Sequence, residues 1–224
     1  MTTVFIVRRG AQRTRASQAQ LEASREFTVL GVAESLYRAQ GTLPTLDPDT
    51  LLIDLRLEDG AALSLVRALR ERQGERPKVM LVAAAAADPL LFATLRAGAD
   101  AYLLESDLPT AAAALRRMTT GAAPMAAPIA AQVLQFFNEP AVPPSGRAAA
   151  VDARALDWHS HAANPMRLSP GECWLLRTLA QGARSAELAP RMAVSVEALG
   201  RRLGNVYRKL SWDVRSGALA LLAA

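Results

Sequence analysis

The chain has 224 residues, a single cysteine and a net charge of +5. This length predicts two domains, because one core usually takes about 100–200 residues. No apolar run approaches the ~18–20 residues of a membrane span, and the N-terminus shows no signal-peptide pattern, so we expect a cytoplasmic protein with no membrane partner. The lone Cys173 can form neither an internal disulfide nor a cysteine-based metal site, which leaves a small core residue as its expected role.

The positive charge is concentrated in the last third of the chain. Residues 1–144 carry 15 Lys+Arg and 15 Asp+Glu, whereas residues 145–224 carry 11 and 6. The whole excess therefore lies in the C-terminal part, as an anionic partner such as DNA would favour.

The first 120 residues alternate between short apolar runs and helical stretches. We expect helices to begin near Ala11, Leu36, Ala61, Asp88 and Leu108. The expected strands are Val4–Val7, Phe27–Val32, Leu51–Leu55, Val79–Val82 and Ala101–Leu104. Continuous apolar strands separated by helices predict a doubly wound, five-stranded parallel sheet with both faces covered.

Functional groups of such sheets gather at the carboxyl ends of the strands. The residues expected there are Arg8, Arg9, Asp54, Ala83 and Glu105. Arg8 and Arg9, with Arg13 and Arg15, place four guanidiniums in eight residues. Either a solvated helix start or an anion-binding cluster would account for them.

A different composition begins after residue 121. Residues 122–165 are rich in Ala and Pro, which predicts a linker interrupted by one helix near Ile129–Phe137. His159 and His161 lie in this region without a third ligand nearby, so we expect no metal site there. The three tryptophans, Trp158, Trp174 and Trp212, are expected to be packing residues.

Three helical patterns follow, which predict a small all-α domain over residues 166–224. The first opens at Ser169-Pro170-Gly171-Glu172, a helix-start signature, and ends at Gly182. The second spans Ser185–Met192, and the third runs from Ser195 to Leu210 with apolar residues spaced three and four apart. The opposite face of that third helix carries Arg201, Arg202, Asn205, Arg208 and Lys209.

The N-terminal segments VFIVRRG, KVMLVAA and AGADAYLLES, with Asp54 between them, resemble a bacterial response-regulator receiver domain. In that family the aspartate is phosphorylated with the help of two acidic metal ligands, a Ser or Thr, and a Lys. Here the matching positions hold Arg8-Arg9, Ala83 and Glu105. Two cations repel Mg²⁺ and a carboxylate repels a phosphoryl dianion, so we predict that residues 1–121 form a pseudo-receiver in which Arg8 or Arg9 pairs with Asp54 and Glu105.

One further receiver position is retained. Tyr102 matches the aromatic switch position of the family, and without a Ser or Thr to respond to, it is expected to be a fixed packing residue.

Residues 168–219 resemble the LuxR-type helix-turn-helix domain of NarL/FixJ response regulators. Leu168-Ser169-Pro170, Glu172, Gly182 and Arg208-Lys209-Leu210 agree in register with its pattern. The resemblance implies that the third helix enters the major groove of double-stranded DNA. The DNA-binding residues implied are Ser195, Ala198, Gly200, Arg201, Arg202, Asn205, Arg208 and Lys209.

Two departures affect that helix. Ala198 and Gly200 replace the usual Thr and Lys, and Gly200 and Gly204 each cost about 1 kcal/mol in a helix interior.

These patterns predict a phosphorylation-independent transcription regulator that binds DNA as a homodimer, without a cofactor and without catalytic turnover. A second reading is a protein-interaction module whose helix-turn-helix no longer binds DNA specifically. A third is a sensor in which the arginine cluster binds an anionic ligand.

Overall fold

The computed structural model describes residues 1–73, 76–139, 152–158 and 167–212. His159, His161 and the residues after Trp212 lie outside these ranges, so the expectations placed on them stay predictions. No helix within the described ranges is long and apolar enough to cross a membrane.

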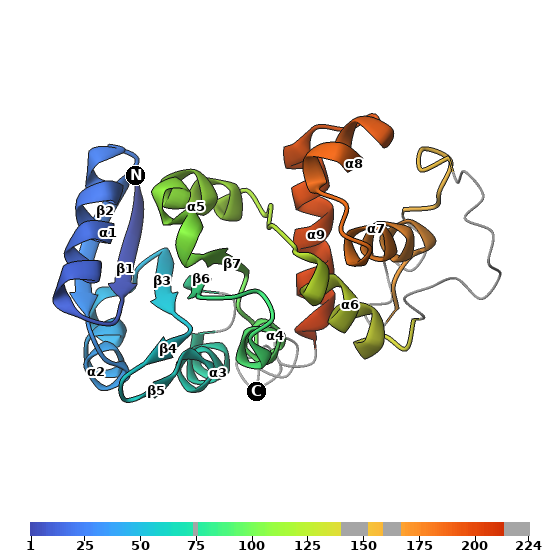
Figure 1. Ribbon diagram of the computed structural model, residues 1–224. Coiled ribbons are helices and arrows are strands. Elements are labelled where there is room, and N and C mark those ends of the chain that lie inside the picture. The colour runs from blue at the N-terminus through green and yellow to red at the C-terminus, as the bar shows by residue number, and fades with distance from the viewer. Residues whose placement is uncertain (74–75, 140–151, 159–166, 213–224) are drawn as a thin grey trace.

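Residues 1–119 form the α/β arrangement that the sequence predicts (Figure 1). Its sheet runs in the order β2-β1-β3-β6-β7 with every neighbouring pair parallel. Its strands are β1 (Thr2–Val7), β2 (Phe27–Ala33), β3 (Thr50–Asp54), β6 (Lys78–Ala83) and β7 (Ala101–Leu104). Its helices are α1 (Ala11–Ala23), α2 (Leu36–Leu46), α3 (Ala62–Gln73), α4 (Pro89–Arg96) and α5 (Ala111–Thr119).

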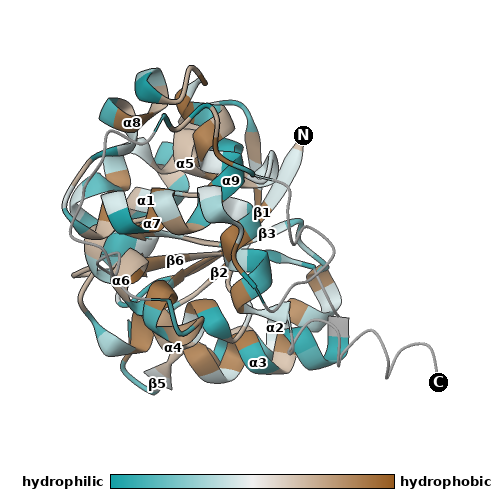
Figure 2. Ribbon diagram, turned by 90° about the vertical axis from the view of Figure 1, so that its right-hand side faces the viewer, coloured by the Kyte–Doolittle hydropathy of each residue, from teal (hydrophilic) through white to brown (hydrophobic). Residues whose placement is uncertain are grey.

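The sheet is buried because its strands are apolar on both faces. Val4 to Val7 of β1 and Leu51 to Ile53 of β3 have no exposed surface. Helices α1 and α5 pack together, and α2, α3 and α4 pack in series at the opposite face. Figure 2 shows the resulting separation, with brown strands such as β6 inside and teal on the outer helical faces. The predicted five-stranded, doubly wound sheet is confirmed.

Two local features differ from the sequence expectation. A hairpin of two-residue strands, β4 (Arg56–Leu57) and β5 (Gly60–Ala61), follows β3; such strands are too short to leave a hydrophobic pattern. The last helix of the sheet region does not begin at Leu108, because a 3₁₀ turn, η1 (Glu105–Thr110), precedes α5. Pro109 lies inside that turn and lacks the backbone N–H that an α-helix would use.

The described part of the C-terminal unit contains the helices α6 (Ala127–Phe136), α7 (Pro170–Ala180), α8 (Ser185–Arg191) and α9 (Val196–Leu210). The predicted helix near Ile129–Phe137 is α6, and its buried Ile129, Val133 and Leu134 pack with α7. This helix is thus part of a helical core, although the sequence placed it in a linker. The domain boundaries at residues 121 and 165 stay predictions.

The starts of α7 and α9 follow from capping residues. The Ser169 hydroxyl accepts a hydrogen bond from the Glu172 backbone N–H, and the Glu172 carboxylate accepts one from the Ser169 N–H. Ser195 caps α9 by accepting from Ala198 N at 3.1 Å. Both caps satisfy backbone donors that a helix start leaves free, and both agree with the predicted starts.

Candidate functional site

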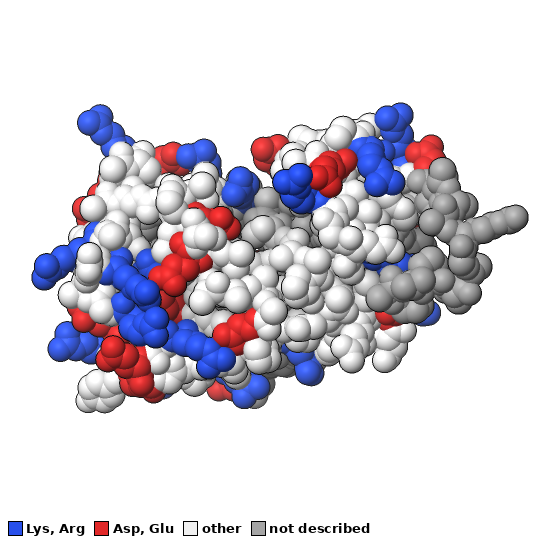
Figure 3. Space-filling view, viewed as in Figure 1, with Lys and Arg blue, Asp and Glu red and all other residues white. Residues whose placement is uncertain are grey.

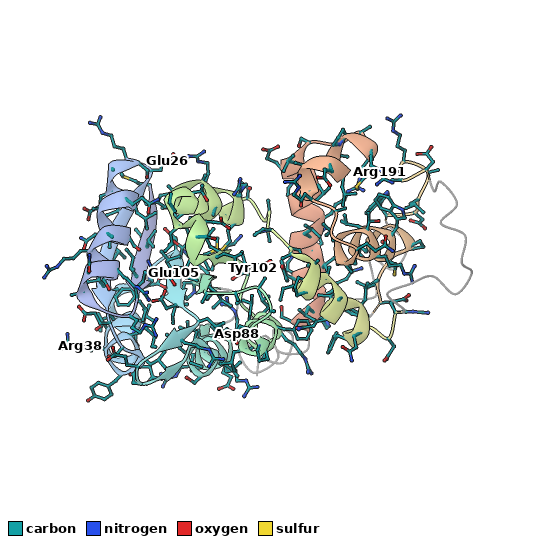
Figure 4. All side chains as sticks on the ribbon, viewed as in Figure 1. Glu26, Arg38, Asp88, Tyr102, Glu105 and Arg191 are labelled. Atoms are coloured by element: carbon teal, nitrogen blue, oxygen red, sulfur yellow. The ribbon has the colours of Figure 1, made fainter. Side chains whose placement is uncertain are left out.

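A hollow of about 200 Å³ lies at the carboxyl ends of β1, β3 and β6. Arg9, Arg13 and Arg56 line it together with Asp54, Asp88 and Glu105. Figure 3 shows blue and red side chains interleaved over this face, and Figure 4 places Glu105 and Asp88 there. Parallel topology brings these residues together, because the strand ends meet at one edge of the sheet.

Both carboxylate oxygens of Asp54 accept hydrogen bonds from the residues that follow β1. Its Oδ1 accepts a hydrogen bond from Arg8 Nε at 2.9 Å, and its Oδ2 accepts one from the backbone N–H of Arg9 at 2.8 Å. The side chains of Arg8 and Asp54 are 3% and 9% exposed, so this ion pair is buried. The predicted pairing is therefore present, with Arg8 contributing its guanidinium and Arg9 only its backbone.

Glu105 is held much less firmly. Its Oε1 lies 3.6 Å from Arg8 Nη2 and 3.3 Å from Arg13 Nη2, and its side chain is 36% exposed. Within the described residues it makes no hydrogen bond, and Arg8 Nη2 likewise finds no hydrogen-bond partner. Glu105 thus balances two guanidiniums without saturating their donors.

Ala83 and Tyr102 occupy the two other positions that resemble those of a receiver. Ala83 is buried at the end of β6 and offers no hydroxyl. Tyr102 on β7 is 3% exposed, and its hydroxyl accepts a hydrogen bond from Ala126 N at 2.7 Å. Burial raises the pKa of Tyr102 to about 12, so the phenol stays neutral. This geometry fits the expected packing role.

The outer face of α9 exposes three of the predicted DNA-binding residues, Arg201, Asn205 and Arg208. The Arg208 guanidinium donates a hydrogen bond to the Asn205 side chain. Ala198 is half-buried, and Ser195 serves as the helix cap. The opposite face packs inward through Leu199, Leu203, Val206 and Leu210, whereas Val196 is 44% exposed, contrary to the expected buried stripe.

Two cations that we expected on the exposed face have other partners. Lys209 Nζ lies 2.7 Å from Glu172 Oε2, with side chains only 12% and 8% exposed. The Arg202 guanidinium stacks 3.8 Å above the Trp158 ring, and desolvation lowers its pKa. The spacing of apolar residues along α9 placed both cations on the opposite, exposed face, but neither the Glu172 carboxylate nor the Trp158 ring could be placed beside the helix from sequence spacing.

Gly200 and Gly204 lie where the segment 121–124 crosses α9. A Cβ on Gly204 would stand 1.9 Å from the Gly121 carbonyl oxygen, and one on Gly200 would stand 3.0 Å from the Ala122 Cβ. The backbone N–H of Ala123 donates to the Gly200 carbonyl at 3.0 Å, and the Tyr207 hydroxyl donates to the Pro124 carbonyl at 2.8 Å. The glycines thus permit a backbone contact between the two units.

Sequence reasoning missed this contact and the position of Trp158. A Cβ on Gly171 would lie 2.4 Å from the Trp158 ring, which therefore sits directly on the start of α7. The small residues Gly121, Ala122, Gly171, Gly200 and Gly204 were the available signal. Such residues indicate a close approach without naming the partner.

Comparisons with known proteins agree with this architecture. Residues 5–109 match the family model described as "Response regulator receiver domain". The chain is 22% identical over 201 residues to the transcriptional regulatory protein YdfI of Bacillus subtilis, covering 90% of this chain and 85% of the relative. It is 25% identical over 199 residues to the DNA-binding transcriptional activator DevR/DosR of Mycobacterium tuberculosis, covering 88% and 83%.

A solved structure titled as the complex of the response regulator RcsB with DNA shares the fold. Its TM-score is 0.51 at 18% identity, with 98% of each chain covered. The family match covers the α/β unit formed by residues 5–109, and over most of its length the chain is similar to proteins named as transcription regulators. The α/β unit and the helices that follow it share their fold with the RcsB structure.

Proposed function

We propose that this protein is a DNA-binding transcription regulator that works without phosphorylation of Asp54. The observation that carries the proposal is the buried Arg8–Asp54 pair. Both Asp54 oxygens already accept hydrogen bonds, and a guanidinium lies where a receiver would need a divalent cation. Both Asp54 oxygens are thus held by donors from the end of β1, and the Arg8 cation opposes the binding of Mg²⁺ beside them.

The surroundings of Asp54 support the same conclusion. Glu105 presents a carboxylate to any incoming phosphoryl group, and Ala83 cannot donate a hydrogen bond to it. The charge inversion is compensated inside the protein, since each carboxylate of the pocket faces an arginine. Such a pocket is stable as it stands and does not need a phosphoryl group to become so.

Intact-mass analysis after incubation with acetyl phosphate and Mg²⁺ tests this half of the proposal. We expect an unmodified chain. A stoichiometric phosphoryl adduct that disappears in Asp54→Asn would overturn it.

The DNA-binding half rests on α9 and on what the relatives are named for. Arg201, Asn205 and Arg208 form an exposed polar face on a capped helix that follows a short turn after α8. Arginine and asparagine are the side chains best suited to hydrogen-bond base edges in the major groove. We expect binding as a dimer on paired half-sites, which sedimentation at tens of micromolar would reveal.

One observation favours a second candidate, a protein-interaction module that does not read DNA. Segment 121–124 covers the α9 face at Gly200 and Gly204, and these two positions offer no side chain to a base. A salt titration of binding to a random DNA library separates the two functions. Affinity that falls as salt rises supports DNA binding, whereas affinity no higher than that of a neutral control protein supports the module.

A further inference from the structure

The pocket around Asp54 holds more hydrogen-bond donors than its carboxylates use. Each Asp54 oxygen accepts one hydrogen bond, from Arg8 Nε and from Arg9 N, and Asp88 accepts two from Arg56 at 2.9 and 3.0 Å. Four guanidiniums, those of Arg8, Arg9, Arg13 and Arg56, thus meet only three carboxylates. The remaining carboxylate, Glu105, is the one without hydrogen bonds.

Two guanidiniums at the hollow, those of Arg8 and Arg9, have N–H groups without a hydrogen-bond acceptor among the described residues. Arg8 is 2% exposed, and its Nη2 has no hydrogen-bond partner within the described residues. The exposed guanidinium of Arg9 also forms no hydrogen bond or ion pair with the part of the chain that the structure describes. Buried donors are usually satisfied, so an acceptor closer than Glu105 Oε1 at 3.6 Å would improve this site.

The start of α1 adds to the positive potential. Its cap residue Gly10 provides no side-chain acceptor, and the first turn carries no acidic residue. Its first backbone N–H groups therefore lack intrahelical acceptors and favour a nearby anion. Arg9 and Arg13, which flank this start, both line the hollow.

We propose that the hollow binds the phosphate group of a small molecule non-covalently, and that this group displaces Glu105 from Arg8 and Arg13. The inference rests on the proposed function, because it assigns an input to a receiver that is not phosphorylated. A tetrahedral oxyanion offers more acceptors at 2.7–2.9 Å than Glu105 provides, and arginine forks match it well. The volume of about 200 Å³ admits inorganic phosphate or a small phosphate monoester.

Glu105 acts in this scheme as an internal competitor. While it stays in place, its charge opposes the incoming anion, and once it moves aside two arginines are left for the ligand. Its 36% exposure and position at the start of the η1 turn allow that movement without unpacking the core.

The test is calorimetric titration of the full chain with inorganic phosphate, in EDTA and with chloride matching the ionic strength. We expect saturable binding by the wild type. Glu105→Gln should bind at least about tenfold more tightly, because the competing charge is gone. Arg9→Gln and Arg13→Gln should each bind about tenfold more weakly. Arg116→Gln, which removes an exposed arginine paired with Glu26 elsewhere, serves as the control and should bind as the wild type does.

Glycerol 3-phosphate distinguishes the two sources of the anion. Tighter binding than that of inorganic phosphate identifies a monoester, and equal or weaker binding identifies free phosphate.

The inference is overturned if the wild type shows no saturable binding of phosphate below about 10 mM, even if Glu105→Gln binds. One tenfold step in affinity corresponds to about 1.4 kcal/mol. Wild-type affinity in both Arg9→Gln and Arg13→Gln overturns it as well. Neither result touches the proposed function, which the incubation with acetyl phosphate and the DNA titration test separately.

Discussion

The hollow around Asp54 and the helix α9 differ in what surrounds them. In the hollow, arginines meet the carboxylates of Asp54 and Glu105, and the Arg8–Asp54 ion pair is buried. On α9, Gly200 and Gly204 carry no side chain, and the backbone of segment 121–124 lies against them. The hollow is thus balanced by charge, whereas the helix face is covered by close steric fit.

The difference matters for function because the ion network of the hollow and the backbone contact on α9 respond to different signals. An ion network can be opened by a competing ion, since its energy depends on charge. A backbone packed on glycines at van der Waals distance cannot be opened by charge, and requires the two units to separate. The segment 121–126 connects these regions, because it contacts Tyr102 of β7 through Ala126 and Tyr207 of α9 through Pro124.

Removing one partner of the buried pair should have the largest effect. Asp54→Ala leaves the Arg8 guanidinium buried without its carboxylate, which should cost about 3–5 kcal/mol of unfolding free energy. Thermal denaturation measures this loss. Arg8→Met combined with Asp54→Ala should recover part of it, because no unpaired charge remains.

Glu26→Ala is the matched control, since it breaks an exposed ion pair to Arg116 and should leave the melting temperature nearly unchanged. If Asp54→Ala melts like the wild type but loses regulation, the compensation account is wrong and Asp54 is a signalling residue.

Lys209→Ala tests whether the Lys209 cation serves stability or DNA binding. Lys209 is paired with the buried Glu172, so its removal should lower stability by about 1.5–3 kcal/mol. The slope of DNA affinity against salt should stay unchanged, because Lys209 is not available to a phosphate. A slope reduced by about one unit at unchanged stability would return Lys209 to the DNA surface.

Gly204→Ala tests the steric closure directly. Its Cβ would overlap the Gly121 carbonyl, so we expect the contact between segment 121–124 and α9 to separate or strain at a cost of about 1–3 kcal/mol. Hydrogen exchange at the Ala123 N–H, which now bonds to Gly200, reports that separation. DNA affinity should rise in the variant if the contact covers the DNA-reading face.

Gly41→Ala is the control for glycine replacement inside a helix. Its Cβ would meet nothing within 4 Å, so it should stabilise α2 by up to about 1 kcal/mol. Equal protection of the Ala123 N–H from exchange in Gly204→Ala and the wild type would show that segment 121–124 does not pack on Gly204.

The sequence predicted most of the fold because its signals are local. Buried strands such as Val4–Val7 and the capping sequence at Ser169 define their elements without reference to distant residues. The pairing of charges at Arg8 and Glu105 could also be predicted, since opposite charges at neighbouring strand ends attract wherever the sheet forms. The partners of Gly204, Arg202 and Lys209 were not predictable, because they lie 83, 44 and 37 residues away in sequence and depend on tertiary packing.

The smallest expected effects concern the two tyrosines that hold segment 121–126. Tyr102→Phe removes the hydrogen bond that the Tyr102 hydroxyl accepts from Ala126 N, and Tyr207→Phe removes the one that the Tyr207 hydroxyl donates to the Pro124 carbonyl. Each loss should cost about 0.5–1.5 kcal/mol. Because both bonds position the same short segment, the double variant should lose less than the sum of the single losses, and a double-mutant cycle measures that coupling.

The same two phenols predict how the contact responds to pH. Burial raises the pKa of Tyr102 to about 12 and also raises that of Tyr207, so the folded state binds these protons more tightly than the unfolded chain, where tyrosine titrates near 10. Their contribution to stability is therefore complete below about pH 10 and is lost as pH rises toward 12. Ultraviolet titration should show the ionisation of Tyr102 and Tyr207 delayed until the protein unfolds. Ionisation of Tyr102 and Tyr207 near pH 10 in the folded protein would show that segment 121–126 does not bury them.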